Sequence, residues 1–283
     1  MPIRNPSSTP GAIAFTTPFS IHLLLWWRLL LTATLALTMI LAPGSSKATS
    51  GLNVAVAANF VAPALEISET FEAKTGIAVT ISSGSTGKFY AQIRHGAPFD
   101  VFLAADSESI TKLIDQGWAV PSDHFTYAVG QLVLWSPDPA RLRDQETAVA
   151  VLKEGRFDRL AMANPLVAPY GAAAQDVLAH LNLATAWPDK RIQGQSIGQA
   201  YQFVASGNAD LGFVALSQII QSNDSNQPVR GSTWLPPQSW YRPLTQDAAR
   251  LTKSMNPEQA RAFLLFLRSP DAKAIMARYG YQP

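Results

Sequence analysis

The residue types that most often carry catalysis or metal binding are sparse in this chain of 283 residues. It contains no cysteine, which excludes a disulfide, a thiolate nucleophile and a cysteine-ligated metal. The four histidines, His22, His95, His124 and His180, form no closely spaced pair of the kind that binds zinc, so we expect each on the surface or at the end of a helix or strand. No Ser–His–acid arrangement is evident either, and the sequence therefore argues against an enzyme.

Two further groups of residues suggest catalytic motifs without meeting their requirements. The segment before Lys88 suggests a phosphate-binding loop, but Ser82 stands where that motif needs glycine, and Phe89 stands where it needs the Ser or Thr that holds magnesium. We expect Lys88 to be a solvated residue in the first turn of a helix. Asp100 and Asp106 could suggest paired acids, but they lie among apolar positions without a nucleophile, and we interpret them as cap and interlobe polar residues.

Two polar loops are better placed for binding. Ala58-Asn59 follows the apolar run Leu52–Ala57, and Gly84–Gly87 follows a second run, Ile77–Ile81. Each loop precedes a segment with helical spacing, and this alternation of strand, loop and helix predicts parallel sheets covered by helices. In such sheets ligands bind beyond the carboxyl ends of the strands, where helices begin. The loops occupy that position.

The alternation continues along the chain. In the first unit the predicted helices are Pro63–Thr75, Lys88–Arg94 and Ser107–Gln116, and a further strand is Val101–Ala104. Thr126–Trp135 is predicted as one long strand that leaves this unit. The second unit has predicted strands Leu160–Ala163 and Asp210–Leu216 and helices at Gly171–Leu181 and from Gln195 to about Ser206. Tyr241–Leu244 is predicted to return the chain to the first unit, and Pro257–Tyr279 is amphipathic and helical. The prediction is an α/β protein of two lobes, residues 49–127 with 241–283 and residues 128–240, joined by a hinge of two crossings with the ligand between them.

The first 48 residues are predicted to be a signal peptide. The apolar run Leu29–Ala42 has the length of a signal-peptide core, and Ser46-Lys47-Ala48 provides small residues for cleavage after Ala48. An uncleaved membrane anchor over Ile21–Ala42 is the alternative. These 48 residues hold three of the 22 Lys and Arg and none of the 20 Asp and Glu, so the remaining chain has a net charge of −1. No basic stripe remains to attract nucleic acid, and overall charge would not capture an anion.

Several sequence motifs, in order along the chain, resemble one known family. They are VAVAANF at Val54–Phe60, SSGSTG at Ser82–Gly87, GAPFDVFLAAD at Gly96–Asp106, NPLVAPYG at Asn164–Gly171, SIGQA at Ser196–Ala200, LGFVA at Leu211–Ala215 and RYGY at Arg278–Tyr281. From Leu52 to Pro283 the chain resembles the type II periplasmic binding proteins of ABC importers, specifically the molybdate-binding family. The resemblance implies the two-lobed fold, a periplasmic location, molybdate or tungstate as ligand, an importer permease as partner and no cofactor. A monomer is the default expectation.

The resemblance also implies a set of ligand-binding residues. By position in the motifs these are Ala58, Asn59, Ser85, Thr86, Tyr170 and Ile197, in loops that include Pro169 and Ser196, with no residue acting as a metal-cation ligand. Many members of the family place a serine where Asn59 stands and a tyrosine near Ala215, which here has no hydroxyl. Tyr170 follows the proline of the second lobe instead, which resembles a subgroup in which Asn and a relocated Tyr complete the site.

These residues suit a doubly charged anion. An ion that loses its hydration must regain hydrogen bonds from the protein, and helix N-termini offer free N–H groups with a partial positive charge. Ile197 can act only through its main chain. None of the six residues is Asp or Glu, so protonated phosphate would lack an acceptor, whereas molybdate, tungstate and sulfate fit. The alternatives are that Asn59 and Ser85-Thr86 are plain helix caps, that the ligand is sulfate, an amino acid, a sugar or another small solute, or that the scaffold is an enzyme's.

Overall fold

The computed structural model describes residues 51–220 and 231–282. The predicted signal peptide, its cleavage site and the alternative anchor lie outside these ranges. Residues Thr49–Pro283 form one compact unit. In the described ranges, no helix combines the length and apolar character that crossing a membrane would require.

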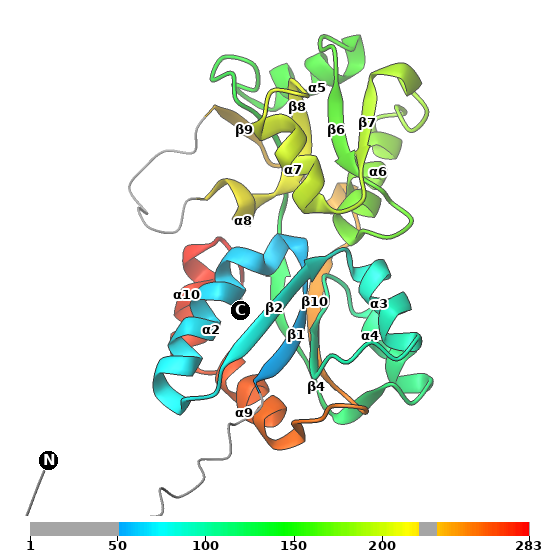
Figure 1. Cartoon of the computed structure of the whole chain (residues 1–283). Coiled ribbons are helices and arrows are strands. Elements are labelled where there is room, and N and C mark those ends of the chain that lie inside the picture. Colours follow the sequence, from blue (N-terminus) through cyan, green and yellow to red (C-terminus); the bar gives the residue numbers. More distant parts are fainter. Residues whose placement is uncertain (1–50, 221–230, 283) are drawn as a thin grey trace, which may run out of the picture. The chain divides into compact units, whose positions relative to one another are not determined.

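The described strands form two five-stranded sheets (Figure 1). The first sheet has the order β2-β1-β3-β10-β4, and we call it with its helices lobe 1. The second has the order β7-β6-β8-β5-β9, and we call it with its helices lobe 2. The strands of lobe 1 are β1 (Leu52–Ala57), β2 (Val79–Gly84), β3 (Val101–Leu103), β4 (Ala119–Gly130) and β10 (Leu244–Leu251). Those of lobe 2 are β5 (Leu132–Ser136), β6 (Leu160–Ala163), β7 (Arg191–Gly194), β8 (Leu211–Ala215) and β9 (Ser232–Trp234).

Helices cover both faces of the lobe 1 sheet, because its strands carry apolar side chains on both faces. Val54 and Val56 of β1 pack in a cluster with residues of α2, α9 and α10, whereas Ala55 packs in another with residues of α3 and α4. The helices are α2 (Val61–Thr75), α3 (Thr86–Arg94), α4 (Glu108–Asp115), α9 (Pro257–Leu267) and α10 (Pro270–Arg278), and a short 3-10 turn, η1 (Ala58–Phe60), joins β1 to α2.

Lobe 2 is built in the same way. Leu134 and Met162 pack in a cluster with residues of α5 and α6, and Val133 and Ala161 in another with residues of α7 and α8. The helices are α5 (Gln145–Glu154), α6 (Pro169–His180), α7 (Ile197–Ala205) and α8 (Leu216–Ile219), with 3-10 turns η2 (Pro188–Lys190) and η3 (Gln238–Trp240).

The chain passes between the lobes twice in sequence order, from β4 to β5 and from β9 to β10. The predicted fold class, two α/β lobes joined by two crossings, is confirmed. The prediction of one long strand over Thr126–Trp135 is wrong. The chain leaves the first sheet at Gly130 and enters the second at Leu132, because β4 pairs with β10 while β5 pairs with β8 and β9. The residue limits given above for the lobes remain a prediction.

The sheets are mixed rather than parallel throughout. In lobe 1, β2, β1 and β3 run parallel, but β10 is antiparallel to both β3 and β4. In lobe 2, β7, β6 and β8 run parallel and β5 is antiparallel to β8 and β9. The antiparallel strands lie on the path between the lobes. Strand β10, with the sequence LTQDAARL, was not predicted because its polar residues do not resemble a buried strand.

Asp100 ties the start of β1 to the segment that precedes α9. Its carboxylate is 2% exposed and accepts hydrogen bonds from Asn53 N at 2.8 Å and Ser254 Oγ at 2.7 Å. It also accepts from the backbone N–H groups of Met255 and Asn256 at 3.1 and 3.3 Å. Of these donors, only the Asn256 N–H has a second acceptor, Ser254 Oγ at 3.2 Å, so three would lose their acceptor if this carboxylate were removed. Asp100 is therefore a structural connector within lobe 1, and none of its described partners belongs to lobe 2, unlike the interlobe role expected from sequence.

Replacing Asp100 with Ala should lower the free energy of unfolding by about 2–4 kcal/mol, because buried donors to a charged group would lose their acceptor. Urea denaturation followed by circular dichroism measures this. Asp189→Ala, at an exposed position, is the control and should change stability by less than about 0.5 kcal/mol. Equal stability of the two variants would contradict the connector role.

Candidate functional site

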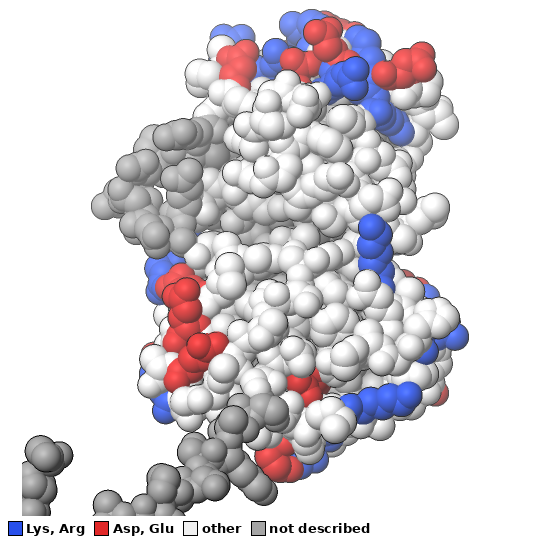
Figure 2. All heavy atoms as spheres, in the orientation of Figure 1, with Lys and Arg blue, Asp and Glu red and all other residues white. Residues whose placement is uncertain are grey.

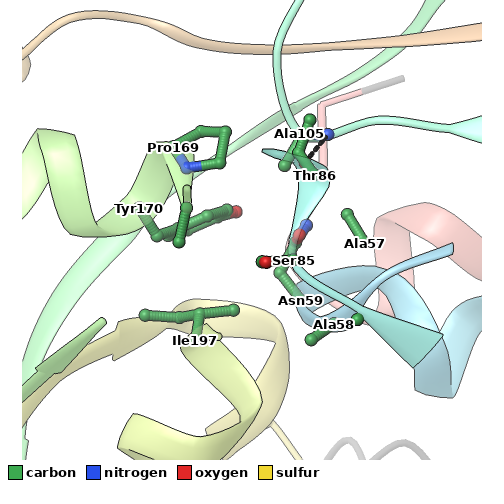
Figure 3. A pocket seen from close by; sticks show the side chains of 11 residues that line it. Ala57, Ala58, Asn59, Ser85, Thr86, Ala105, Pro169, Tyr170 and Ile197 are labelled. Atoms are coloured by element: carbon green, nitrogen blue, oxygen red, sulfur yellow. Dashed lines mark hydrogen bonds between the residues drawn. The ribbon is translucent and has the colours of Figure 1, made fainter. Parts of the chain in front are cut away.

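A small cavity lies where the two lobes meet, at the carboxyl ends of β1 and β2 and at the beginnings of α3, α6 and α7. All six residues that the sequence predicts as ligand-binding line it, and their side chains converge on one space (Figure 3). The lining residues are Ala57, Ala58, Asn59, Gly84, Ser85, Thr86 and Ala105 from lobe 1, and Ala168, Pro169, Tyr170 and Ile197 from lobe 2. The structure thus brings these residues together around one space.

Ser85 and Thr86 lie at the start of α3 and present two hydroxyls. Ser85 occupies the cap position, but its side chain makes no cap hydrogen bond. Its Oγ is buried and has no hydrogen-bond partner among the described residues. Thr86 Oγ1 accepts the N–H of Ala105 at 3.0 Å, which leaves its own hydrogen free to donate. The alternative that Ser85 is only a helix cap is therefore not supported.

Tyr170 lies in the first turn of α6, after Pro169, and is fully buried. Its Oη accepts a hydrogen bond from Gln246 Nε2 at 3.3 Å. Because the oxygen acts as acceptor there, Gln246 does not use the phenolic hydrogen, which can go to a ligand or to the neighbouring phenol of Tyr281. Burial, and secondarily the neighbouring phenols of Tyr281 and Tyr127, raise the pKa of Tyr170 well above its usual value. Tyr170 is therefore a neutral donor throughout the physiological range.

Asn59 differs from the predicted arrangement. Its side chain is 3% exposed, and its Nδ2 donates to Gln246 Oε1 and to Tyr281 Oη, each at 2.9 Å. The amide nitrogen that was expected to donate to a ligand is thus already engaged behind the cavity. Asn59 Oδ1 is buried with no partner among the described residues. The side chain does not cap a helix, so the plain-cap alternative fails here as well.

Backbone N–H groups add to the donors of the side chains. Within the described residues the N–H groups of Thr86, Tyr170 and Ile197 have no acceptor, as expected in the first turn of a helix. Three helices, α3, α6 and α7, begin at this cavity, and each contributes a partial positive charge. Ile197 is apolar, so only its main chain can bind a polar ligand. The combination suits an anion.

The cavity has no charged wall. None of the described residues that line it is Asp, Glu, Lys, Arg or His. Lys88 is exposed, and Asp106, which precedes the N-cap residue Ser107 of α4, accepts the Ser109 N–H of the first turn at 2.7 Å. Burial raises the pKa of Asp106 against the lowering effect of that hydrogen bond. On the face seen in Figure 2, the charged atoms of lobe 2 gather at its outer end, whereas lobe 1 carries charged atoms along its sides, some of them close to the boundary between the lobes. In the described part of the chain, no group of His, Asp and Glu could hold a metal ion.

The lobes approach closely enough to exclude a large ligand. Gly87 N–H in lobe 1 donates to Val167 O in lobe 2 at 2.9 Å. Ser217 Oγ in lobe 2 donates to Asn59 O at 2.7 Å. The volume of the cavity is about 10 Å³, close to what one water molecule needs. In this arrangement the site has room for about one water molecule, so a tetrahedral oxyanion would require the cavity to widen, and an amino acid or a sugar would require a larger separation of the lobes.

A second layer of polar residues lies behind the cavity and was not predicted from sequence. Tyr127, Gln246 and Tyr281 are buried. Tyr127 Oη donates to Gln246 Oε1, and Tyr281 Oη accepts from Asn59 Nδ2. Tyr281 was noticed only as part of the terminal RYGY motif. Nothing in the local sequence distinguishes Gln246, because its role arises from long-range contacts with positions 59, 127 and 170.

These features define a class of protein: two α/β lobes on a double crossing, with a small uncharged cavity that collects donors from both lobes. Comparisons with known proteins agree. A family model described as bacterial extracellular solute-binding protein matches residues 52–282. The molybdate-binding protein ModA of Azotobacter vinelandii is 50% identical over 230 residues, which are 81% of this chain and 89% of that protein. ModA of Rhodobacter capsulatus is 46% identical over 246 residues, 87% and 94% of the two chains.

A solved structure supports the same relationship. The Azotobacter vinelandii periplasmic molybdate-binding protein superposes with a TM-score of 0.77 at 42% identity, over 82% of this chain and 99% of that one. The chain belongs to the bacterial extracellular solute-binding protein family. It is a binding protein and not an enzyme, as predicted.

The buried phenols should resist ionisation until the protein unfolds. Burial raises the pKa of Tyr281 from about 10 to about 12, and those of Tyr127 and Tyr170 are also raised. A raised phenol pKa contributes stability that is complete below pH 10 and is lost as the pH rises toward 12. An alkaline titration should therefore show phenolate absorbance from these residues only together with the loss of the circular dichroism signal. Ionisation of all seven tyrosines near pH 10 with the fold intact would contradict this.

Proposed function

We propose that this protein binds a small, fully ionised tetrahedral oxyanion, molybdate or tungstate, between its lobes, and delivers it to the permease of an ABC importer. The observation that carries the proposal is the set of uncharged donors at the cavity, above all the Ser85 hydroxyl, which is buried without a partner. A buried polar group with no partner is costly and calls for a ligand that satisfies it. The two relatives named as molybdate-binding proteins support the choice of ion.

The donors match the needs of a desolvated dianion. Ser85 Oγ, Thr86 Oγ1 and Tyr170 Oη each have a hydrogen to give, and the N–H groups at the starts of α3, α6 and α7 supply more. Hydrogen bonds to a charged acceptor are roughly twice as strong as those between neutral groups. The site therefore binds through many aligned dipoles and needs no lysine or arginine.

The same arrangement argues against phosphate. At neutral pH phosphate carries at least one proton, and that proton needs an acceptor. No carboxylate lines the cavity among the described residues, and the unpartnered side-chain acceptor of the lining is the neutral amide oxygen Asn59 Oδ1, a weaker acceptor than a carboxylate. A hydrogen bond left unmade in a buried site costs about 1–3 kcal/mol. Sulfate is fully ionised and is not disfavoured on this ground, so discrimination against sulfate depends on size.

The biological setting follows from the family. Extracellular solute-binding proteins work outside the cytoplasm, and we place this chain in the periplasm, exported by the leader over residues 1–48. Its partner is the membrane permease of an importer, and the ion is cargo rather than a cofactor. A monomer suffices, because each chain supplies both lobes of the site.

Calorimetric titration with molybdate, tungstate, sulfate and phosphate tests the proposal directly. Molybdate and tungstate should bind tightly and with one-to-one stoichiometry, and phosphate should bind at least about a hundredfold more weakly, the cost of about two unmade or mismatched hydrogen bonds. Tight binding of sulfate alone would show that the protein is a sulfate-binding protein instead. Failure of every oxyanion to bind would refute the proposal.

Ser85→Ala should weaken binding of molybdate by about 1–3 kcal/mol without lowering the free energy of unfolding, because Ser85 Oγ donates to no group of the described protein. Ser269→Ala is the matched control. Its Oγ caps α10 by accepting the Ala272 N–H at 3.3 Å, so its loss should lower stability by about 0.5–2 kcal/mol and leave affinity unchanged. Calorimetry and urea denaturation on both variants separate the two effects. Unchanged affinity in Ser85→Ala would remove this residue from the site.

A further inference from the structure

We propose that Gln246 is a positioning residue that sets the direction of the hydrogen bonds made by Asn59 and Tyr170, and thereby keeps the Tyr170 hydrogen available to an anion. The inference deepens the proposed function and rests on it, since it assumes an oxyanion ligand. Gln246 does not itself line the cavity. It acts through residues that do.

Gln246 lies on β10, two residues after the strand begins and close to the crossing from lobe 2. Its side chain is fully buried, although a glutamine seldom is. Strand β10 pairs there with the end of β4, where Leu244 lies opposite Gly130. A Cβ at Gly130 would overlap both Gln246 Nε2 and Tyr170 Oη. The glycine therefore permits the amide to meet the phenol across the hinge.

Three hydrogen bonds hold the amide. Gln246 Oε1 accepts from Asn59 Nδ2 and from Tyr127 Oη, each at 2.9 Å. Gln246 Nε2 donates to Tyr170 Oη at 3.3 Å. Asn59 comes from lobe 1 and Tyr170 from lobe 2, so this one side chain touches ligand-site residues of both lobes.

The hydrogen bonds around Asn59 agree with the amide nitrogen of Gln246 facing Tyr170. Tyr281 Oη donates to Asn59 O at 2.8 Å, and its oxygen accepts from Asn59 Nδ2. The other hydrogen of Asn59 Nδ2 points to Gln246, which must present its oxygen there. The nitrogen of the Gln246 amide is consequently turned toward Tyr170.

This direction has a chemical consequence at the cavity. A phenol that accepts a hydrogen bond from behind keeps its own hydrogen for an acceptor in front. If an oxygen faced Tyr170 instead, the phenolic hydrogen would be drawn to it, and a lone pair would be left facing the anion. A glutamine can hold the required direction without charge, whereas a carboxylate would reverse it and repel a dianion.

Gln246→Glu tests the proposal because its two protonation states make opposite predictions. A protonated carboxyl has one O–H donor and one carbonyl acceptor, and so reproduces the pattern of the amide. An ionised carboxylate offers only acceptors. Burial raises the pKa of such a group, in documented cases to about 8–9, which brings the change within a usable range. The variant should therefore bind molybdate close to normally in mild acid and poorly in mild base.

The control is Gln92→Glu, which makes the same charge change at an exposed position of α3 in the same lobe. The titratable groups that face position 246 are the phenols of Tyr127, Tyr170 and Tyr281, whose pKa values are all raised. Asp247 follows on β10 and bonds Thr126 Oγ1 at 2.7 Å, with His124 Nε2 at 3.9 Å. Both variants and the wild type carry these groups, so their contribution cancels.

Calorimetry with molybdate between about pH 6 and about pH 8.5 should give a flat affinity for the wild type and for Gln92→Glu. The affinity of Gln246→Glu should fall as the pH rises, by up to about tenfold per pH unit, the limit for one linked proton. Gln246→Met, neutral at every pH, should bind about three- to tenfold more weakly than the wild type, because Tyr170 would lose the donor that orients it, and its profile should be flat.

Each outcome decides the matter. A pH-independent loss in Gln246→Glu equal to that of Gln246→Met would reduce Gln246 to a packing residue and overturn the proposal. Wild-type affinity in either variant would overturn it as well. If Gln246→Glu does not fold, a double-mutant cycle of Gln246→Met with Tyr170→Phe decides: losses of affinity that are not additive support the proposal, and additive losses overturn it. A wild type that binds neither molybdate nor tungstate refutes the proposed function. A wild type that binds, with variants of equal affinity, refutes only the role of Gln246.

Discussion

The structure depends on a simple constraint: polar groups taken out of water must have partners. At the junction of the lobes this constraint divides the buried groups into two sets. Gln246, Tyr127 and the Asn59 amide nitrogen satisfy one another behind the cavity. Ser85 Oγ and the free hydrogen of Tyr170 are left for whatever enters it. The layer behind makes the layer in front possible, because donors held in place need little reorganisation to bind an ion.

The fold brings these groups together through short connections between its strands and helices. Each parallel strand of a lobe ends at the edge that faces the other lobe, and a helix starts within a few residues of it. Three of those helices begin at the cavity, so their unpaired N–H groups meet without any extended loop. The hydrogen bond from Gly87 N–H to Val167 O also joins lobe 1 to lobe 2. An uncharged site can thus hold an anion because backbone geometry, repeated in both lobes, supplies the positive potential.

Much of this could be predicted from local sequence. Strand β1 was placed at its observed limits, α2 ends before Gly76 with the left-handed φ of 71° that glycine allows, and the loops at Ser85 and Tyr170 do line the cavity. The failures share a cause. Strand β10 buries Gln246, Asp247 and Arg250, whose partners lie on β4 and beyond, so polarity concealed the strand. The amide of Asn59 was assigned to the ligand because its neighbours Gln246 and Tyr281 are 187 and 222 residues away in sequence.

Gly130, at the crossing between the lobes, lies against Tyr170, which lines the cavity. Because Gly130 has no side chain, the phenol of Tyr170 lies directly against the segment by which the chain crosses from lobe 1 to lobe 2. Parting the lobes therefore removes the tyrosine together with the start of α7 in a single displacement, while Ser85 and Thr86 stay behind. The lining of the cavity would then be divided between the two lobes, and both parts would be opened to water.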